Sequence, residues 1–348
     1  MMRRMPLGPG LAVLVLAVFS APAAAQMTAG AISLQIAPSA RADAMGTAYT
    51  AIAYDAYATW WNPAGLAFLG ETLGPGEAMP SHRSVAVTFS KLVPDFFDDV
   101  YYSYATYAQK LGPWSGFGVS VPFITYGEIP IVKEAAGGGS GVQIGTHTPA
   151  EFSAVFGYGI RPFEGHNIGV GASVKVYRSD LAPDINDPSF DLEGGATGTT
   201  FAADLGFLYR SKSLPLALGA AMLNLGPDIT YVKARESSPM PRVLKVGAAY
   251  EVYSQGNSTV LGAMDVTKPF VELQDEIIYG AGFEYLFNWG SSGNIALRAG
   301  YYSEKEGDIQ DPTFGLGISW MGFRYDFVSF PQSSVLDYVT RHSLQFSW

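Results

Sequence analysis

The side chains that most often carry chemistry are scarce and scattered in this 348-residue sequence. Cysteine is absent, and the four histidines, His82, His147, His166 and His342, are far apart in the chain. Metal ligands recur at short, defined spacings, and these histidines do not. Solvated or interfacial histidines are the simpler interpretation.

Other reactive patterns are equally weak. The sequence lacks the G-x-S-x-G turn of serine hydrolases. The glycine-rich run at 137–141 lacks the Gly-Lys-Ser/Thr ending of a phosphate loop and favours a flexible outer loop. Asp184, Asp187, Asp191 and Glu193 miss the spacing of a calcium loop and are interpreted as a solvated loop. We therefore expect no enzymatic activity, no bound metal and no cofactor.

The N-terminus indicates export. Arg3 and Arg4 precede the apolar run Leu11–Phe19, and Ala23-Ala24-Ala25 forms a cleavage site, which together predict a signal peptide over residues 1–25. A membrane anchor is disfavoured, because no stop-transfer pattern follows. Loss of the two arginines takes the formal charge from -10 to -12. Such an acidic chain is poorly suited to bind nucleic acid.

The composition of the rest points to a membrane. Charged residues make up only 15 % and aromatic residues 14 % of the sequence, whereas soluble domains carry about 25 % charged residues. After the signal peptide no apolar run approaches the length of a transmembrane helix. A closed β-barrel is the remaining structure that pairs its backbone groups within lipid. An exported chain without disulfides also implies a large, self-sufficient architecture.

Alternating segments of about ten residues support this fold class from Arg83 onward. In 166–178, for example, Ile168 and Val174 point to one side, and Ser173 and Lys175 to the other. The fourteen predicted strands are 83–91, 99–110, 115–125, 150–162, 166–178, 199–211, 214–224, 243–253, 258–267, 276–287, 293–303, 313–320, 322–330 and 340–348.

Connection lengths distinguish a membrane barrel from a soluble sandwich. Long connections such as 92–98 and 126–149 alternate throughout with short turns such as 111–114 and 254–257. Outer-membrane barrels combine long outer loops with tight periplasmic turns, and a sandwich has no reason to keep that alternation. We predict an all-β membrane protein, a 14-stranded antiparallel barrel over residues 83–348, in the outer membrane of a Gram-negative bacterium.

Residues 26–82 lack barrel periodicity and are predicted to form a hatch inside the barrel. The alanine-rich stretch 41–59 can form a short helix, which Asn62-Pro63 would end or redirect. A periplasmic linker is the alternative, but it would leave Trp60 and Trp61 exposed. The hatch is expected to contact polar side chains that face the lumen: Lys175, Asp204, Lys245, Asp265, Glu284, Arg298, Arg324 and Asp326.

The C-terminal residues form a final amphipathic strand, with His342, Leu344, Phe346 and Trp348 on one face. A last strand that ends in an aromatic residue looks like the signal read by the bacterial outer-membrane insertion machinery. A strand that merely packs would show the same alternation. The aromatic residue at the last position favours the signal, with Phe346 and Trp348 as its main elements.

A resemblance to a known family extends these inferences. The stretch ADAMGTAYTAIAYDAYATWWNPAGLA resembles the hatch of the PorV/PorQ family, relatives of the FadL long-chain fatty acid channels. KLVPD (91–95), YGEI (126–129), NLGPDITY (224–231) and MPRVLKVGAAY (240–250) match in the same order. The resemblance assigns Trp60, Trp61, Asn62, Pro63 and Ala64 to the hatch. It implies an outer-membrane subunit of a type IX secretion system, which receives cargo from a giant translocon and passes it to a surface sortase.

Two main functions follow from these features, with a structural barrel without transport as a third. In a secretion adaptor, the candidate partner loops contain Lys91, Pro94, Asp95, Glu128, Asn224, Gly226, Pro227 and Pro241. The Gly226-Pro227 step also suits a tight turn, so this motif could serve folding instead. In a FadL-like channel for hydrophobic compounds, Pro122 would open the wall, because proline removes a donor from the strand ladder. Alternatively, Pro122 lies at the rim, where the ladder ends.

Overall fold

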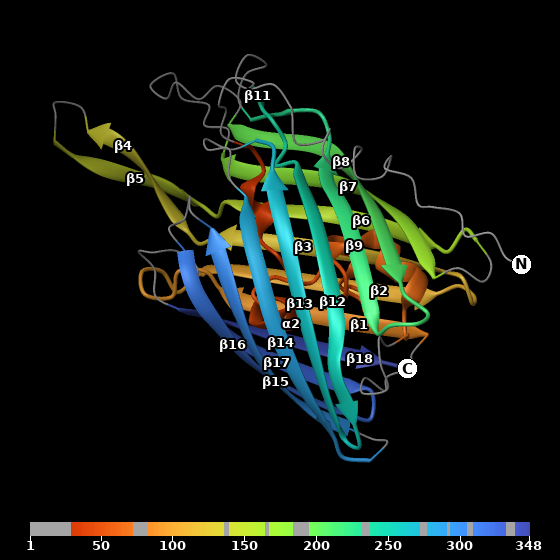
Figure 1. The fold of residues 1–348 in the computed structure, drawn as a ribbon. Coiled ribbons are helices and arrows are strands. Elements are labelled where there is room, and N and C mark those ends of the chain that lie inside the picture. Colours follow the sequence, from red (N-terminus) through yellow and green to blue (C-terminus); the bar gives the residue numbers. More distant parts are fainter. Residues whose placement is uncertain are drawn as a thin grey trace, which may run out of the picture.

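A closed antiparallel barrel dominates the fold (Figure 1). The computed structural model describes residues 29–71, 82–135, 139–163, 167–183, 195–231, 237–271, 277–290, 293–304, 309–331 and 338–348. The predicted signal peptide lies outside these residues. The barrel strands are β1 (Arg83–Lys91), β2 (Val100–Lys110), β3 (Ser115–Tyr126), β6 (Ala150–Ile160), β7 (Ile168–Ala182), β8 (Ala196–Arg210), β9 (Leu216–Leu225), β12 (Val243–Gln255), β13 (Ser258–Pro269), β14 (Ile278–Asn288), β15 (Gly293–Glu304), β16 (Ile309–Trp320), β17 (Phe323–Phe330) and β18 (Val339–Ser347).

These fourteen strands confirm the predicted fold class. Barrel neighbours pair in chain order, and β1 closes the barrel against β18, with Val87 opposite Leu344. Along β1 the outward Val85, Val87 and Phe89 are exposed while the residues between them are buried. The exposed apolar face suits lipid, and the small and polar face lines the lumen.

The predicted boundaries are least accurate at the outer ends of three strands: β16, which begins at Ile309 rather than at 313, and the neighbours β7 and β8. The outer ends of β7 and β8 reach Ala182 and Ala196, beyond the predicted 178 and 199. The two strands stay paired there despite a register shift between Asp180 and Ala182. The shift interrupts the two-residue alternation, so the pattern ended before the strand did.

Two further hairpins lie in connections between barrel strands. β4 (Ile129–Ala135) pairs with β5 (Gly139–His147), and this hairpin extends away from the barrel (Figure 1). The short pair β10 (Ile229–Thr230) and β11 (Ser237–Ser238) lies between β9 and β12. The interpretation of 137–141 as a flexible loop was wrong for 139–141, which begin β5. Glycine-rich segments have low strand propensity, so pairing with β4 was not visible in the local sequence.

The described helices are short and all belong to the N-terminal segment 29–71. They are η1 (Ile32–Gln35), α2 (Ala40–Ala44), α3 (Ala58–Trp61) and η2 (Pro63–Phe68). Within the described residues, no helix is long and apolar enough to cross a membrane. The segment, coloured red to orange in Figure 1, lies inside the barrel, where most of its apolar side chains form one core with inward residues of the wall. We call residues 29–71, which lie within the predicted hatch 26–82, the hatch.

Candidate functional site: the hatch and the outer cavity

Asn62 and Pro63 fix the central turn of the hatch. Pro63 occupies the first position of η2, where a missing N–H is tolerated, and the Asn62 side chain accepts a hydrogen bond from the Ala64 N–H at 3.2 Å. The Asn62 amide also donates to the Thr50 carbonyl at 2.9 Å and to the Phe207 carbonyl of β8 at 3.0 Å. Asn62 therefore caps a helix, closes a hatch loop and ties the hatch to the wall.

Glycines on the lumen side of the wall make room for this turn. A Cβ on Gly171 would lie 2.3 Å from the Pro63 carbonyl carbon, and one on Gly206 would lie 2.3 Å from the Asn62 Oδ1. Real Cβ atoms do not approach that closely, so only glycine lets the hatch backbone lie directly on β7 and β8.

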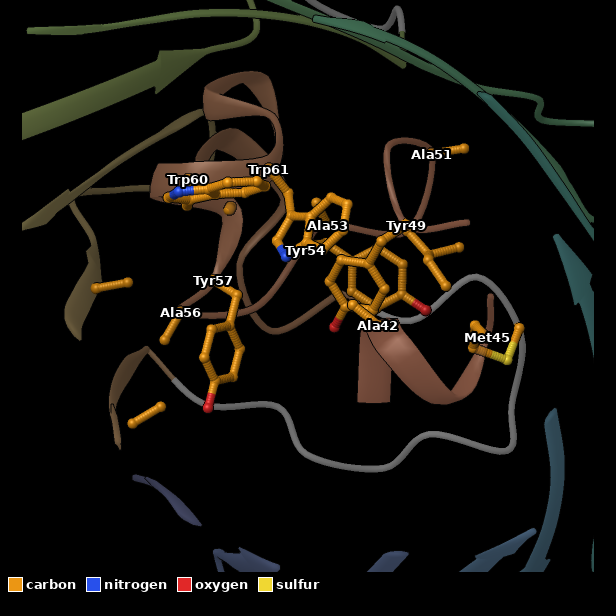
Figure 2. Close-up of a cluster of buried hydrophobic side chains, with 14 of the residues drawn as sticks. Ala42, Met45, Tyr49, Ala51, Ala53, Tyr54, Ala56, Tyr57, Trp60 and Trp61 are labelled. Carbon is orange, nitrogen blue, oxygen red and sulfur yellow. The ribbon is translucent and has the colours of Figure 1, made fainter. Parts of the chain in front are cut away.

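Trp60 and Trp61 are buried in an aromatic cluster of the hatch, as Figure 2 shows. Their ring centroids are 4.9 Å apart, and Tyr49 lies 5.5 Å from Trp61. The Trp61 indole donates to the Pro38 carbonyl at 2.9 Å. From the wall, the Lys245 ammonium lies 4.8 Å from the Trp61 ring and 5.8 Å from the Trp60 ring, a cation–π arrangement.

Arg41 joins the hatch to a buried ionic network in the wall. Its guanidinium donates to Glu284 of β14 at 2.6 and 2.9 Å. Arg298 of β15 bonds Glu284 at 2.5 Å and Asp326 of β17 at 2.8 Å. Arg324 donates to Asp326 at 2.9 Å. These interlocked charges fix α2 against one side of the barrel.

Two carboxylates anchor other parts of the lumen. Asp265 of β13 accepts from the Tyr49 N–H, the Thr50 N–H and the Thr50 hydroxyl at 3.0, 2.9 and 2.6 Å. On β8, Asp204 pairs with Lys175 of β7 at 2.9 Å. All eight residues predicted to face the lumen do so: Lys175, Asp204, Lys245, Asp265, Glu284, Arg298, Arg324 and Asp326.

Glu71, the last described residue of the hatch, lies in a cluster of cations at the barrel end with short turns. It contacts Lys110 of β2 at 2.9 Å, Arg161 after β6, and Arg210 of β8 at 3.7 Å. Arg161 also stacks on Phe68, 4.4 Å from the ring centroid. We call this arrangement the Glu71 clamp, because it fixes the end of the hatch to β2, to β8 and to the residue that follows β6.

A cavity of about 350 Å³ remains between the hatch and the outer ends of the strands. The hatch contributes Leu34, Ile36, Trp60 and Trp61 to its lining. The wall contributes apolar residues and a few charged groups: Leu223, Val243, Lys245, Ile278, Glu304, Phe330 and Arg341. Its size and mixed lining match those of small-molecule pockets.

Charged groups of the hatch and outer loops are tuned by their surroundings. Arg341 of β18 bonds both Asp43 and the Ala37 carbonyl, the latter at 2.5 Å. Burial raises the pKa of Asp43 to about 6, although the neighbouring Arg341 opposes that shift. In the loop after β1, a hydrogen bond from Lys91 lowers the pKa of Asp98. Desolvation therefore raises the pKa of a carboxyl group, as at Asp43, whereas pairing with a cation lowers it, as at Asp98.

Pro122 lies within β3, away from its ends. β3 pairs with β6 at Ser120 and again at Phe123, but the ladder has no partner pairs at Val121 and Pro122. The missing N–H of proline explains this local break. A void of about 10 Å³ lies on its lumen side, lined by Ser33, Leu34, Glu151 and Ser153 among others.

The predicted partner loops divide into exposed and buried residues. Lys91, Pro94, Asp95 and Glu128 are exposed at the outer end, and the Glu128 N–H donates to Asp99 at 2.9 Å. Two neighbouring loops therefore meet there and present these residues to solvent.

Asn224 and Pro241 are instead buried. The Asn224 side chain accepts from Lys175 at 2.6 Å and donates to the Pro241 carbonyl at 2.9 Å. A Cβ on Gly226 would lie 2.2 Å from the Phe201 carbonyl oxygen, whereas Pro227 is exposed. In this conformation the motif packs the loop onto the barrel, as the folding alternative requires.

The remaining predicted residues lie on the outer surface of the barrel or far from the cavity. Phe346 on β18 and Trp348 directly after it are exposed, with stacked rings 5.3 Å apart. His342 bonds the Tyr325 hydroxyl at 2.8 Å, and His147 lies 3.5 Å from Asp180. His166 and the acidic stretch 184–193 fall outside the described residues. Among the residues that the structure describes, no group of acidic and histidine side chains could hold a metal.

Five charged residues of the site were not predicted from the sequence: Arg41, Asp43, Glu71, Arg161 and Arg341. Each lies outside a clear alternating pattern or at a strand end, so its partner was not apparent. The sequence did contain one indication of these contacts, the charged residues within the alanine-rich hatch. A charged residue that is buried needs a partner.

Comparison with known proteins agrees with this geometry. A search of curated proteins found no match. A Pseudomonas aeruginosa FadL homologue aligns with a TM-score of 0.52 and 9 % identity, over 93 % of this chain and 100 % of that one. The toluene transporter TodX of P. putida aligns with a TM-score of 0.51 and 12 % identity, over 88 % and 97 % of the two chains. The monoaromatic hydrocarbon channel CymD aligns with a TM-score of 0.52 and 13 % identity, over 88 % of this chain and 96 % of that one.

These distant likenesses establish the fold, a FadL-like barrel. Residues 20–275 match a protein family described as "Type IX secretion system protein PorV". The match covers most of the chain, including the hatch and the barrel strands β1 to β13, and it ends before β14. The chain therefore belongs to the PorV family of outer-membrane β-barrel proteins of type IX secretion.

Proposed function

We propose that this chain is a non-enzymatic adaptor of a type IX-like secretion system, which receives cargo at the cell surface and passes it on. Its partners would be a giant translocon, the secreted cargo and a surface sortase. Membership of the PorV family supports a place in secretion. The filled lumen supports an adaptor, because the hatch occupies the path that a polypeptide would take through the barrel.

The observation that carries this proposal is the exposed apolar surface at the outer end. Phe96 and Phe97 in the loop after β1 are 65 % and 60 % exposed. The β4–β5 hairpin, which extends away from the barrel, exposes Ile129, Val132, Val142 and Ile144 by 48–57 %. Because these side chains lie in connections beyond the barrel wall, we expect acyl chains not to cover them. Apolar surface gathered there is typical of protein contact.

Substitution of this surface tests the proposal. Val142→Ser with Ile144→Ser is expected to reduce both surface display of secreted proteins and co-purification with a large translocon barrel after mild extraction. Leu111→Ser with Leu214→Ser is the matched control, because these residues are similarly exposed at the other end of the barrel. Unchanged display and a monomer under mild extraction would contradict the adaptor.

A FadL-like channel for hydrophobic compounds is the second candidate, favoured by the wall at Pro122. Leu34 lines both the outer cavity and the void beside Pro122, so a thin part of the hatch separates the two. If the wall opens there, Pro122→Val should restore ladder pairing and reduce uptake of a hydrophobic compound. Loss of uptake on gene deletion, with surface proteins still displayed, would favour this candidate over the adaptor.

We also propose that the insertion machinery reads Phe346 and Trp348. Phe346→Ala with Trp348→Ala should slow assembly in the membrane more than Phe314→Ala, another exposed aromatic residue of the outer wall. Equal assembly rates would indicate that the two rings only pack on the barrel surface.

A further inference from the structure

The outer cavity contains a cation that the carboxylates of Asp265, Glu304 and Asp43 attract only from beyond ion-pair distance. Lys245 is only 9 % exposed and lines the cavity. Among the described residues its ammonium has no hydrogen bond or ion pair; its close neighbours are the rings of Trp60 and Trp61. By contrast, Lys175 pairs with Asp204, and Arg298 pairs with Glu284 and Asp326.

Other hydrogen-bond donors on the cavity lining also lack partners. The Nε atoms of Arg341 and Arg242 are buried without a hydrogen-bond partner. Two carboxylates line the cavity as well, but Asp43 is held by Arg341 and Glu304 accepts from Tyr302 at 2.8 Å. Three cations and two carboxylates line the cavity. Arg242 contacts Asp228 at 3.5 Å and Arg341 contacts Asp43, so Lys245 is the cation of the described lining without an ion pair.

The rest of the lining is mainly apolar. Ile36, Leu92, Leu223, Val243, Ile278 and Phe330 contribute to it. A buried ammonium is costly without an anion, and an apolar surface favours an apolar ligand body. One ligand chemistry satisfies both requirements, a carboxylate carried on an apolar group.

We propose that the outer cavity binds an amphipathic carboxylate, with the carboxylate on Lys245 and the apolar body against the opposite lining. The cavity volume of about 350 Å³ limits the bound part to a small acid or the last residues of a polypeptide. The site distinguishes an organic anion from a neutral hydrocarbon of the same shape. Binding requires neither a role in secretion nor transport through the wall.

The test uses the full mature protein in detergent and calorimetric titration with 4-phenylbutyrate and its neutral analogue 4-phenylbutanol. The acid should bind about tenfold or more tightly than the alcohol, since hydrogen bonds to charged groups stabilise binding more than neutral ones. Lys245→Met should remove this preference and leave alcohol binding unchanged. Lys245→Arg should retain a preference for the acid.

Lys268→Met is the matched control, because Lys268 lies on the neighbouring strand β13, outside the cavity lining. Electrophoretic mobility with and without heating checks that each variant barrel is folded. Equal affinity for acid and alcohol, no binding of either, or an unchanged preference in folded Lys245→Met would overturn the proposal.

A second pair of probes identifies the source of the carboxylate. An apolar hexapeptide with a free C-terminus is compared with the same peptide carrying a C-terminal amide. Binding of the free peptide, lost on amidation and in Lys245→Met, supports a polypeptide terminus. Binding of phenylbutyrate alone supports a small organic acid. These outcomes leave the adaptor proposal untouched, because that proposal is tested on the outer hairpin.

Discussion

The lumen around Arg41 and the outer cavity around Lys245 are built from similar side chains, but their charges are satisfied differently. Near Arg41, three arginines share Glu284 and Asp326, and the neighbouring cavity is only about 60 Å³. Near Lys245, the cation lies against two indole rings and the space is open. A closed network holds a segment in place, whereas an unpaired cation beside a cavity can recognise a ligand. The two regions divide the lumen into an anchor and a receptor.

Breaking the anchor should give the largest effect. Glu284→Ala removes the carboxylate that Arg41 and Arg298 share and leaves their charges buried. The expected loss of unfolding free energy is about 3–5 kcal/mol, as when one partner of a buried ion pair is deleted. Urea unfolding of the refolded barrel measures it, with the exposed Glu128→Ala as control. A loss equal to that of the control would contradict an anchoring role.

Crowding the contact between hatch and wall should have an intermediate effect. Gly206→Ala places a Cβ 2.3 Å from the Asn62 Oδ1, so the turn at Asn62-Pro63 must shift. We expect destabilisation by about 1–3 kcal/mol, typical of overpacking, with faster proteolysis of the hatch. At Gly112 nothing lies within 4 Å of the added atom, and Gly112→Ala is the control. Similar proteolysis of the two variants would show that the hatch does not depend on this contact.

Weakening the Glu71 clamp should have a smaller, local effect. Glu71→Gln keeps the shape of the side chain but removes the charge facing Lys110, Arg161 and Arg210. Because Glu71 is one-third exposed, we expect the free energy of unfolding to fall by only about 1 kcal/mol. Hydrogen exchange should increase at residues 67–71 and remain unchanged around Arg41. A uniform increase along the hatch would mean that the clamp and the Arg41 network form one cooperative unit.

The surface pair of Lys91 and Asp98 should have the smallest effect. Its atoms are 2.8 Å apart, but both side chains are well exposed, so solvent and salt screen the attraction. Lys91→Gln is expected to leave the urea midpoint unchanged within error. A clear decrease would assign this loop a structural role and weaken its interpretation as partner surface.

The alternation of apolar and polar residues predicted most of the barrel wall, but it predicted few of the contacts between the wall and the hatch. The alternation through Val85, Val87 and Phe89 placed lipid-facing and lumen-facing residues correctly, because β-strands reverse side at every residue. The same rule identified Glu284 and Lys245 as inward-facing. It gave no indication that Arg41 pairs with Glu284, which lies 243 positions away. It also did not predict the β4–β5 hairpin, whose exposed strands lack a two-sided pattern.

The amino-acid sequence by itself determined the barrel, its strand order and the segment that fills it, because these depend on periodicity, loop length and composition. Only the tertiary structure decided which inward charges are paired and which one faces open space. Lys175 and Lys245 look alike in sequence, each an inward lysine on an alternating strand. Lys175 has a carboxylate at 2.9 Å and Lys245 has two tryptophan rings, because partners from distant strands and the hatch meet only once the barrel closes.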